Sequence, residues 1–323
     1  MIERLNNFRR LAIVGTAKNV GKTTTLNWLL ERFEERNETL AITSVGRDGE
    51  PVDMVTERPK PRIVPPVGTL VATARATVAR SEARLEKVFS TPFRTALGPV
   101  DIYRVLSRGK VEVAGPVAAY QAAELASMLS EQVTRVLIDG AIDRRASAAI
   151  SDGIVLATGM ALDPDPEEVF RQTLAHCQML SLPSLPDLPA KAGFLQGEHF
   201  TPWEGTALDR VDWTIPAGAD TILLGGALTE GLAQKILAHA PLRVVVPNGT
   251  HLVMGPPLFE KMEERGIRFF ARTPMQLAAV TLNPTSPHDD GAIPEAFLAR
   301  MRALPVPVFD LCLEKGTQHA TAP

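Results

Sequence analysis

The chain has 323 residues, 45% of them apolar and 22% charged, which is enough to bury one large core or two moderate ones. A net charge of -3 without a long basic run argues against nucleic acid as the main partner, because binding to a phosphate backbone needs clustered lysine and arginine. No apolar run approaches the ~20 residues that span a bilayer, and no N-terminal stretch has the apolar centre of a signal peptide, so we expect a cytoplasmic protein without a membrane partner.

The first strong pattern is an apolar strand at 11–15 that leads through a turn into a helix. Converging backbone N–H groups and a helix N-terminus are suited to binding phosphate. In such a turn Gly21 would let the backbone approach closely, Lys22 would reach the β- and γ-phosphates, and Thr23 would ligate Mg²⁺. The pattern predicts a phosphate-binding loop that holds ATP with Mg²⁺. The residues predicted to bind the nucleotide in this loop are Gly15, Thr16, Asn19, Val20, Gly21, Lys22, Thr23 and Thr24.

The loop departs from the simplest G-x-x-x-x-G-K-T pattern, because Thr16 stands where the first glycine is expected and Gly15 comes one residue earlier. The shifted form, Gly-Thr-x-x-x-Val-Gly-Lys-Thr, resembles the phosphate loop of dethiobiotin synthetases and of the related cobyrinic-acid amidases. These enzymes belong to a large class that includes nitrogenase iron proteins and partitioning ATPases. The resemblance implies an α/β fold, that of a P-loop NTPase with a mostly parallel sheet.

A second strand is expected at 40–45, followed by a polar segment at 46–53. Loops at the carboxyl ends of parallel strands line the ligand crevice in this architecture. Asp48, Glu50 and Asp53 therefore form a candidate switch segment, with Asp48 as a nucleotide contact and Asp53 as a Mg²⁺ ligand. A solvated acidic turn is the alternative interpretation of the same residues.

Two further elements are expected next in the chain. They are a hairpin that pairs 97–105 with 110–116 and a helix at 118–132. The next apolar run, 136–139, ends in the carboxylate of Asp139. A buried parallel strand of this kind carries an acid to the edge of the sheet, where it can hold Mg²⁺ or its water shell. The predicted catalytic residues are Lys22 and Asp139, and the predicted metal ligands are Thr23, Asp53 and Asp139.

Residues 154–159 are expected to form another strand, and a helix is expected to follow Asp165. The proline-rich stretch 181–189 breaks regular structure and is interpreted as the join between two lobes. We therefore expect a P-loop nucleotide-binding domain at 1–180 and a second, smaller α/β lobe at 190–323 that docks a partner or a substrate. The elements expected in the second lobe are strands at 221–228, 242–246, 267–271, 277–282 and 306–311 and a helix at 259–265.

Other residues that could carry chemistry give weaker signals. Gly225 and Gly226 precede a helix and could cradle an anion, but no lysine accompanies them. His251 follows a strand, where a ligand could be reached, although a lone histidine is more often structural. Cys177 and Cys312 lie far apart without neighbouring ligands, so we expect buried reduced thiols. None of the 6 histidines joins a second His, Cys or carboxylate at a metal-ligand spacing, so we expect no transition metal.

Two enzyme classes with similar loops fit the sequence poorly. A partitioning ATPase would carry its signature lysine four residues before Gly21, where this chain has Ala17, and would be expected to have a terminal amphipathic helix. A glutamine-dependent amidase needs a cysteine on a strand-to-helix turn, whereas Cys177 falls on an expected helix and Cys312 follows the last strand. A carboxylate-activating ligase of the dethiobiotin synthetase kind stays open.

A wider set of short matches resembles the small ATPase subunit of the lysine 5,6-aminomutase reactivating system. The resemblance implies a chaperone-like ATPase that acts with a larger partner ATPase similar to mismatch-repair proteins. Together they would exchange damaged cobalamin for intact adenosylcobalamin on lysine 5,6-aminomutase. The segments that carry the resemblance are 42–50, Lys60-Pro61, 72–74, 97–100, 114–116, 138–144 and 156–159.

Two functions are therefore expected from the sequence, an ATPase that remodels a protein partner and a ligase or kinase that acts on a small molecule. ATP turnover by the first should rise with protein partners. Turnover by the second should need only a small carboxylate or amine. A nucleotide-binding module without hydrolysis is a third alternative.

Overall fold

The computed structural model describes the chain except for residues 49–61, 141–145, 204–213, 284–294 and 312–323. Contacts between residues divide the chain into two compact units. Unit 1 comprises Met1–Val169 together with Leu277–Pro323, and unit 2 comprises Phe170–Gln276. Unit 2 is thus an insertion in the sequence of unit 1.

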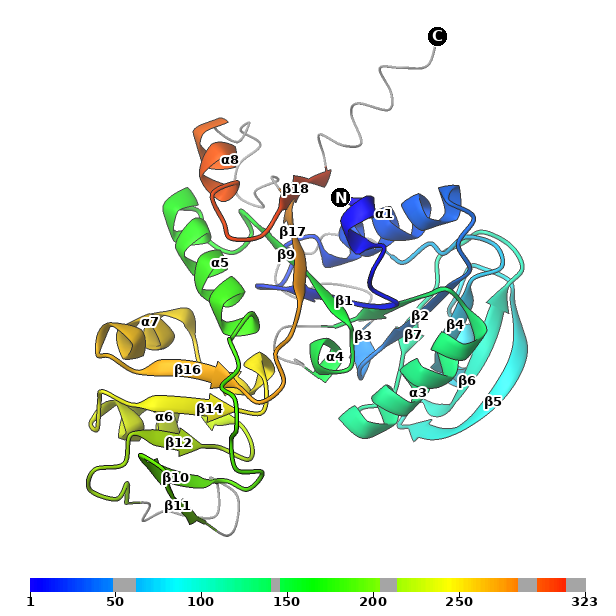
Figure 1. The fold of residues 1–323 in the computed structure, drawn as a ribbon. Coiled ribbons are helices and arrows are strands. Elements are labelled where there is room, and N and C mark those ends of the chain that lie inside the picture. Colours follow the sequence, from blue (N-terminus) through cyan, green and yellow to red (C-terminus); the bar gives the residue numbers. More distant parts are fainter. Residues whose placement is uncertain (49–61, 141–145, 204–213, 284–294, 312–323) are drawn as a thin grey trace. The chain divides into compact units, whose positions relative to one another are not determined.

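Unit 1 is built on a nine-stranded sheet in the order β18-β17-β9-β1-β8-β2-β4-β6-β5 (Figure 1). Neighbouring strands from β18 to β4 pair in parallel, and β6 runs antiparallel to both β4 and β5. The central strands are buried along their whole length and mostly apolar, as is typical of strands covered on both faces. The strands are β1 (Arg10–Gly15), β2 (Leu40–Ser44), β4 (Leu70–Ala74), β5 (Leu85–Thr95), β6 (Gly98–Val105), β8 (Arg135–Asp139), β9 (Gly153–Gly159), β17 (Leu277–Asn283) and β18 (Val308–Asp310).

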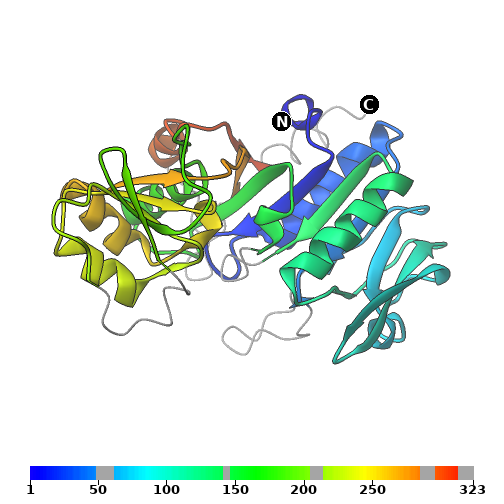
Figure 2. The same cartoon turned by 60° about the horizontal axis from the view of Figure 1, so that its bottom comes forward.

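Two long helices, α1 (Lys22–Glu35) and α3 (Ala119–Gln132), cover opposite faces of this sheet (Figure 1, Figure 2). Successive residues of β8 show the alternation, because Leu137 belongs to the core with α1 whereas Val136 and Ile138 belong to the core with α3. The smaller elements of unit 1 are η1 (Ile2–Leu5), α2 (Arg75–Val78), α4 (Ala146–Ala149), α8 (Glu295–Met301) and an antiparallel pair of β3 (Arg47–Asp48) with β7 (Val113–Ala114).

Unit 2 has its own five-stranded sheet in the order β11-β10-β12-β14-β16. Strands β12, β14 and β16 are parallel, and β10 runs antiparallel to β12 and β11. Its core includes Phe259 stacked on Phe269, with ring centroids 5.0 Å apart. The elements are α5 (Pro166–Leu180, which starts in unit 1), β10 (Gly193–Gln196), β11 (His199–Pro202), β12 (Thr221–Leu223), β13 (Leu228–Thr229), α6 (Glu230–Leu237), β14 (Arg243–Val246), η3 (Gly249–His251), β15 (Leu252–Val253), α7 (Pro256–Glu264) and β16 (Arg268–Ala271).

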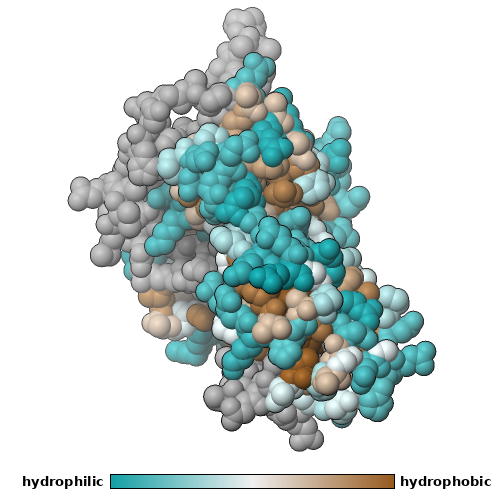
Figure 3. All heavy atoms as spheres, turned by 90° about the vertical axis from the view of Figure 1, so that its left-hand side faces the viewer, coloured by the Kyte–Doolittle hydropathy of each residue, from teal (hydrophilic) through white to brown (hydrophobic). Residues whose placement is uncertain are grey.

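The surface is largely hydrophilic on the face that Figure 3 shows, with hydrophobic residues in smaller groups among polar ones. Across the described part of the chain, no helix combines the length and the apolar character that crossing a bilayer requires.

The α/β fold with a large, mostly parallel sheet is confirmed, but the expected boundary between the lobes is wrong. The division into 1–180 and 190–323 fails because β17 pairs with β9 and β18 pairs with β17, which returns the end of the chain to the first sheet. The segment 181–189, interpreted as the join, lies inside unit 2.

The expected hairpin of 97–105 with 110–116 is also wrong. Strand β6 pairs instead with β5, which the sequence analysis did not anticipate, and on its other side with β4. The turn between β5 and β6 closes at Gly98, whose φ of 100° is in the left-handed region that favours glycine. Strand β7 pairs with β3.

Candidate functional site

The loop between β1 and α1 is a short turn that leads from a strand end to a helix N-terminus. Strand β1 ends at Gly15 and α1 begins at Lys22, with Gly21 as its N-terminal cap. Gly21 has φ 94° and Asn19 has φ 63°, conformations that glycine and asparagine adopt at the lowest cost. A Cβ atom on Gly15 would lie 2.7 Å from Lys22 Cγ, so a glycine is needed at 15 to leave room for the lysine side chain.

Thr16 occupies the place of the expected first glycine, and its contacts explain why a threonine fits there. Its backbone N–H donates to the Ala157 carbonyl oxygen at 2.9 Å. Its hydroxyl donates to the Thr158 hydroxyl at 3.2 Å, and Thr16 itself is buried. The threonine therefore ties the start of the loop to β9, the strand beside β1.

Lys22 and Asp139 come together at the carboxyl edge of the sheet. Lys22 Nζ donates to the carbonyl oxygen of Gly140 at 3.1 Å, and Gly140 directly follows Asp139 at the end of β8. Asp139 is buried, and in register it faces Ile13 of β1 on one side and Ser44 of β2 on the other. Thr23, half-buried, is the second residue of α1. The structure thus places the predicted lysine, at the start of α1, beside the strand end that carries the predicted carboxylate.

The start of the predicted switch segment is fixed to the loop that precedes α3. The Ser44 hydroxyl donates to the Gly46 carbonyl oxygen at 2.9 Å and accepts from the Gly115 N–H at 3.1 Å. The Gly46 N–H donates to the Pro116 carbonyl oxygen at 2.9 Å. Asp48 follows in β3, whereas Glu50 and Asp53 lie outside the described residues.

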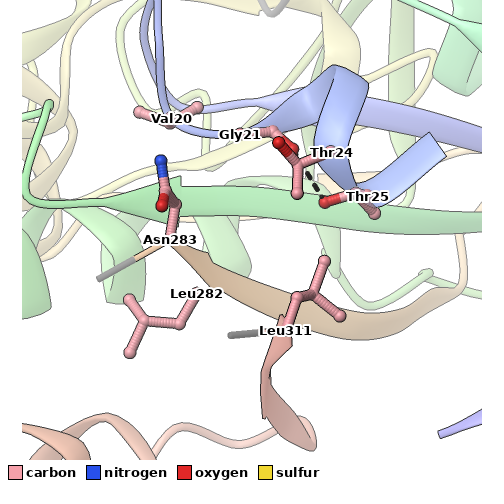
Figure 4. Close-up of a pocket in the computed structure, with 7 residues that line it drawn as sticks. All are labelled: Val20, Gly21, Thr24, Thr25, Leu282, Asn283 and Leu311. Atoms are coloured by element: carbon pink, nitrogen blue, oxygen red, sulfur yellow. Dashed lines mark hydrogen bonds between the residues drawn. The ribbon is translucent and has the colours of Figure 1, made fainter. Parts of the chain in front are cut away.

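Asn283, at the end of β17, is a site residue that the sequence analysis missed. Its side-chain Nδ2 donates to the Asn19 carbonyl oxygen at 3.4 Å, and its Cβ would be 3.0 Å from a Cβ placed on Gly21. Figure 4 shows Asn283 beside the loop, at a small and open pocket. The signal was a polar residue ending an apolar strand, the same signal that identified Asp139. The pocket is lined by Val20, Gly21, Thr24, Thr25, Leu282, Asn283 and Leu311.

The candidates in unit 2 have structural explanations. His251 Nδ1 lies 3.0 Å from Asn248 Oδ1, which also accepts from the Thr250 N–H, and burial lowers the pKa of the imidazole. Cys177 is buried in α5, and desolvation raises the pKa of its thiol to about 12, which disfavours the thiolate that a nucleophile needs. The expectation that it belongs to the core is confirmed. Cys312 lies outside the described residues.

The side chains of Thr23 and Asp139 supply oxygen donors, the kind that Mg²⁺ prefers. Within the described ranges, no three His, Cys, Asp or Glu side chains are grouped so that they could hold a metal ion. Mg²⁺ commonly takes only one or two protein oxygens and completes its shell with phosphate and water. The Thr23 hydroxyl and the Asp139 carboxylate are of the right chemistry for that role.

Neither a protein-family model nor a curated protein matches the chain. Solved structures with similarity include the kinase domain of the Escherichia coli tyrosine kinase ETK, at 12% identity and TM-score 0.27 over 48% of this chain and 57% of the other. Cobyrinic acid a,c-diamide synthase from Mycobacterium smegmatis, with a bound ATP analog and magnesium, has 13% identity and TM-score 0.26 over 47% and 59%. The ParA protein of pNOB8 bound to nonspecific DNA has 12% identity and TM-score 0.29 over 55% and 63%.

This chain therefore covers less than two thirds of the length of each of those three proteins. Similarity at this level does not identify an activity. Unit 1 itself has the parallel sheet, and its strand β1, the loop after it and helix α1 follow in the order predicted for a phosphate-binding loop.

Proposed function

We propose that unit 1 binds ATP with Mg²⁺ and hydrolyses it. The observation that carries the proposal is the position of Lys22, whose ammonium group lies at the end of the strand that carries Asp139. Loop N–H groups and Lys22 would hold the phosphates, while Thr23 and Asp139 would hold the metal. When bound, Mg²⁺ would neutralise charge on the phosphate oxygens.

Asp48, Glu50 and Asp53 stay candidates for a segment that responds to the γ-phosphate, because they follow β2, whose last residue Ser44 is opposite Asp139 in the sheet.

We further propose that the output of this ATPase is the remodelling of a protein partner. The support is the sequence resemblance to the small ATPase subunit of the lysine 5,6-aminomutase reactivating system. The partners would be lysine 5,6-aminomutase and a larger ATPase similar to mismatch-repair proteins. Release of a tightly held cofactor requires a change of conformation, and nucleotide binding and hydrolysis can stabilise two states differently.

The test mixes the protein and its partner ATPase with aminomutase that has been inactivated by turnover, adding ATP, Mg²⁺ and fresh adenosylcobalamin. We expect activity to recover with the wild-type protein and not with Lys22→Ala. Failure to recover with the wild type, or full recovery with the variant, would reject reactivation.

A ligase similar to dethiobiotin synthetase is the second candidate, because the form of the loop from Gly15 to Thr23 also matches that family. It would turn over ATP with a small carboxylate or amine and no protein partner. Measuring phosphate release with each addition alone separates the two functions.

A further inference from the structure

The path of the chain makes β17 the strand on which unit 2 returns to unit 1. The chain leaves unit 1 after β9, through α5, and re-enters it at Leu277, the first residue of β17. Strands β9 and β17 are neighbours and parallel, with Thr281 opposite Ala157 and Leu282 opposite Thr158. The inserted unit is therefore joined covalently to two adjacent strands of the nucleotide-binding sheet.

Thr281 connects β17 to the first turn of α1. Its hydroxyl lies 2.8 Å from the Thr25 hydroxyl, and both side chains are only 1% exposed. The Thr25 hydroxyl also donates to the Gly21 carbonyl oxygen at 3.1 Å. Because a hydroxyl has one proton, that donation makes Thr281 the donor in the threonine pair. A short buried chain of hydrogen bonds thus runs from β17 to Gly21 in the loop.

Asn283 makes a second connection from the same strand. Its amide reaches the Asn19 carbonyl oxygen, and its Cβ packs against Gly21. The two contacts fall on the two loop residues with positive φ, Asn19 and Gly21. The strand therefore supports the part of the loop whose conformation is most demanding.

Strand β9 holds the other end of the loop. The Ala157 carbonyl oxygen accepts from the Thr16 N–H, and the Thr158 hydroxyl accepts from the Thr16 hydroxyl. Both strands that are joined to unit 2 therefore contact the phosphate loop directly, β9 at its start and β17 at its end.

We propose that Thr281 and Asn283 are positioning residues that hold the phosphate loop, and that β17 thereby couples nucleotide binding to the stability of unit 2. The coupling rests on the proposed binding of ATP to unit 1. It is reciprocal, because a ligand that shifts one site shifts the other by the same factor. A partner bound to unit 2 would therefore change the affinity for the nucleotide.

Hydrogen exchange on the full chain tests the coupling. Exchange in peptides from β12, β14 and β16 is compared with and without a nonhydrolysable ATP analogue and Mg²⁺, after calorimetry has established binding. In the wild type we expect exchange in these strands to slow by about threefold or more when the nucleotide binds. Thr281→Val keeps the shape of the side chain but removes the hydroxyl, and we expect it to lose most of this response while binding the analogue within about tenfold of wild type.

Thr43→Val is the matched control, because Thr43 is equally buried on β2 and its hydroxyl contacts the Ala72 carbonyl oxygen. We expect Thr43→Val to respond as the wild type does. Thr281→Ser keeps the hydroxyl, so exchange in unit 2 should still slow when the nucleotide binds. Asn283→Ala is a second test variant, outside the core, and should show less slowing than the wild type.

The outcomes separate this inference from the proposed function. Binding of the analogue by the wild type without any change in unit 2 overturns the coupling and leaves ATP binding intact. A full response in both Thr281→Val and Asn283→Ala overturns the roles of these residues. Absence of analogue binding by the wild type overturns the proposed function, and the coupling with it.

Discussion

The glycine turn after β1 in unit 1 and the glycine turn after β12 in unit 2 occupy equivalent places, each at the carboxyl end of a buried parallel strand. The helices that follow differ. Helix α1 begins with Lys22 and has no acid in its first turn, whereas α6 begins with Glu230, whose carboxylate accepts from the Gly255 N–H at 3.2 Å. An acid at a helix N-terminus occupies the position where an anion would be stabilised.

The glycines themselves also differ between the two turns. A Cβ on Gly15 would collide with the Lys22 side chain, but a Cβ on Gly226 would meet nothing within 4 Å. A glycine turn at a sheet edge is therefore not sufficient for a phosphate site. Unit 1 differs from unit 2 in having Lys22, the Thr23 hydroxyl and a neighbouring strand that ends in Asp139. Substitutions in the two units can test that difference.

The largest effect on folding is expected in unit 2, from Gly249→Ala. The added Cβ would lie 2.0 Å from the Met179 carbonyl oxygen, a backbone atom that cannot move aside. We expect the free energy of unfolding of unit 2 to fall by about 3 kcal/mol or more. Gly226→Ala is the control and should change little. Chemical denaturation monitored by hydrogen exchange in unit 2 measures both, and equal stabilities of the two variants would contradict the packing described here.

Asp139→Asn should raise the Mg²⁺ concentration needed for half-maximal ATP binding at least about tenfold, or 1.4 kcal/mol, because it removes a negative charge from the proposed Mg²⁺ site. Asp152→Asn is the matched control, since Asp152 pairs with Arg10 at the opposite, amino edge of the same sheet. Titrating Mg²⁺ at fixed ATP distinguishes the two. The same loss in both variants would argue against a metal role for Asp139.

Comparing Gly21→Ala with Gly68→Ala separates the effect of backbone strain on stability from a direct effect on ATP binding. Both glycines have positive φ, 94° and 91°, so each alanine should cost about 1–2 kcal/mol of stability. A Cβ on Gly68 meets nothing within 4 Å. Thermal unfolding should show a loss for both variants, the larger one for Gly21→Ala because its Cβ would also crowd Asn283. Only Gly21→Ala should lose affinity for ATP. A similar drop in ATP affinity for Gly68→Ala would show that the effect is indirect.

The smallest expected effect is the pH dependence that His251 gives to unit 2. Burial lowers the pKa of the folded-state imidazole below its ordinary value of 6.5, so the unfolded chain binds more protons as the pH falls through that value. The stability of unit 2 should therefore decrease below about pH 6.5, by at most about 1.4 kcal/mol per pH unit. His251→Gln should remove this component. A wild type whose stability rises on acidification in this range would contradict the assignment.

The elements of this fold were predictable wherever a local pattern is sufficient. Apolar runs predicted β2, β8 and β9, and the glycine–lysine–threonine sequence located the start of α1. The order of strands in the sheet is not encoded locally, so nothing in residues 277–283 distinguished a strand of unit 1 from one of unit 2. The domain boundary and the hairpin were wrong for this reason.

The same limit applied to the site. Lys22 and Asp139 were found because their neighbours in sequence form recognisable patterns. Asn283 was missed because it meets Asn19 only after the sheet has brought β17 beside β9, across a separation of 264 residues. The reason for a threonine at 16 likewise lies in its contact with Thr158, on a strand distant in sequence.

The central claim is that the loop from Gly15 to Thr23 binds a nucleoside triphosphate through Lys22. Calorimetric titration of ATP with Mg²⁺ into the wild type, Lys22→Ala and Lys18→Ala tests it most directly, because Lys18 is an exposed lysine in the same loop. We predict that the wild type and Lys18→Ala bind alike and that Lys22→Ala binds at least about tenfold more weakly, a loss of 1.4 kcal/mol or more. Equal binding by the wild type and Lys22→Ala would contradict the claim.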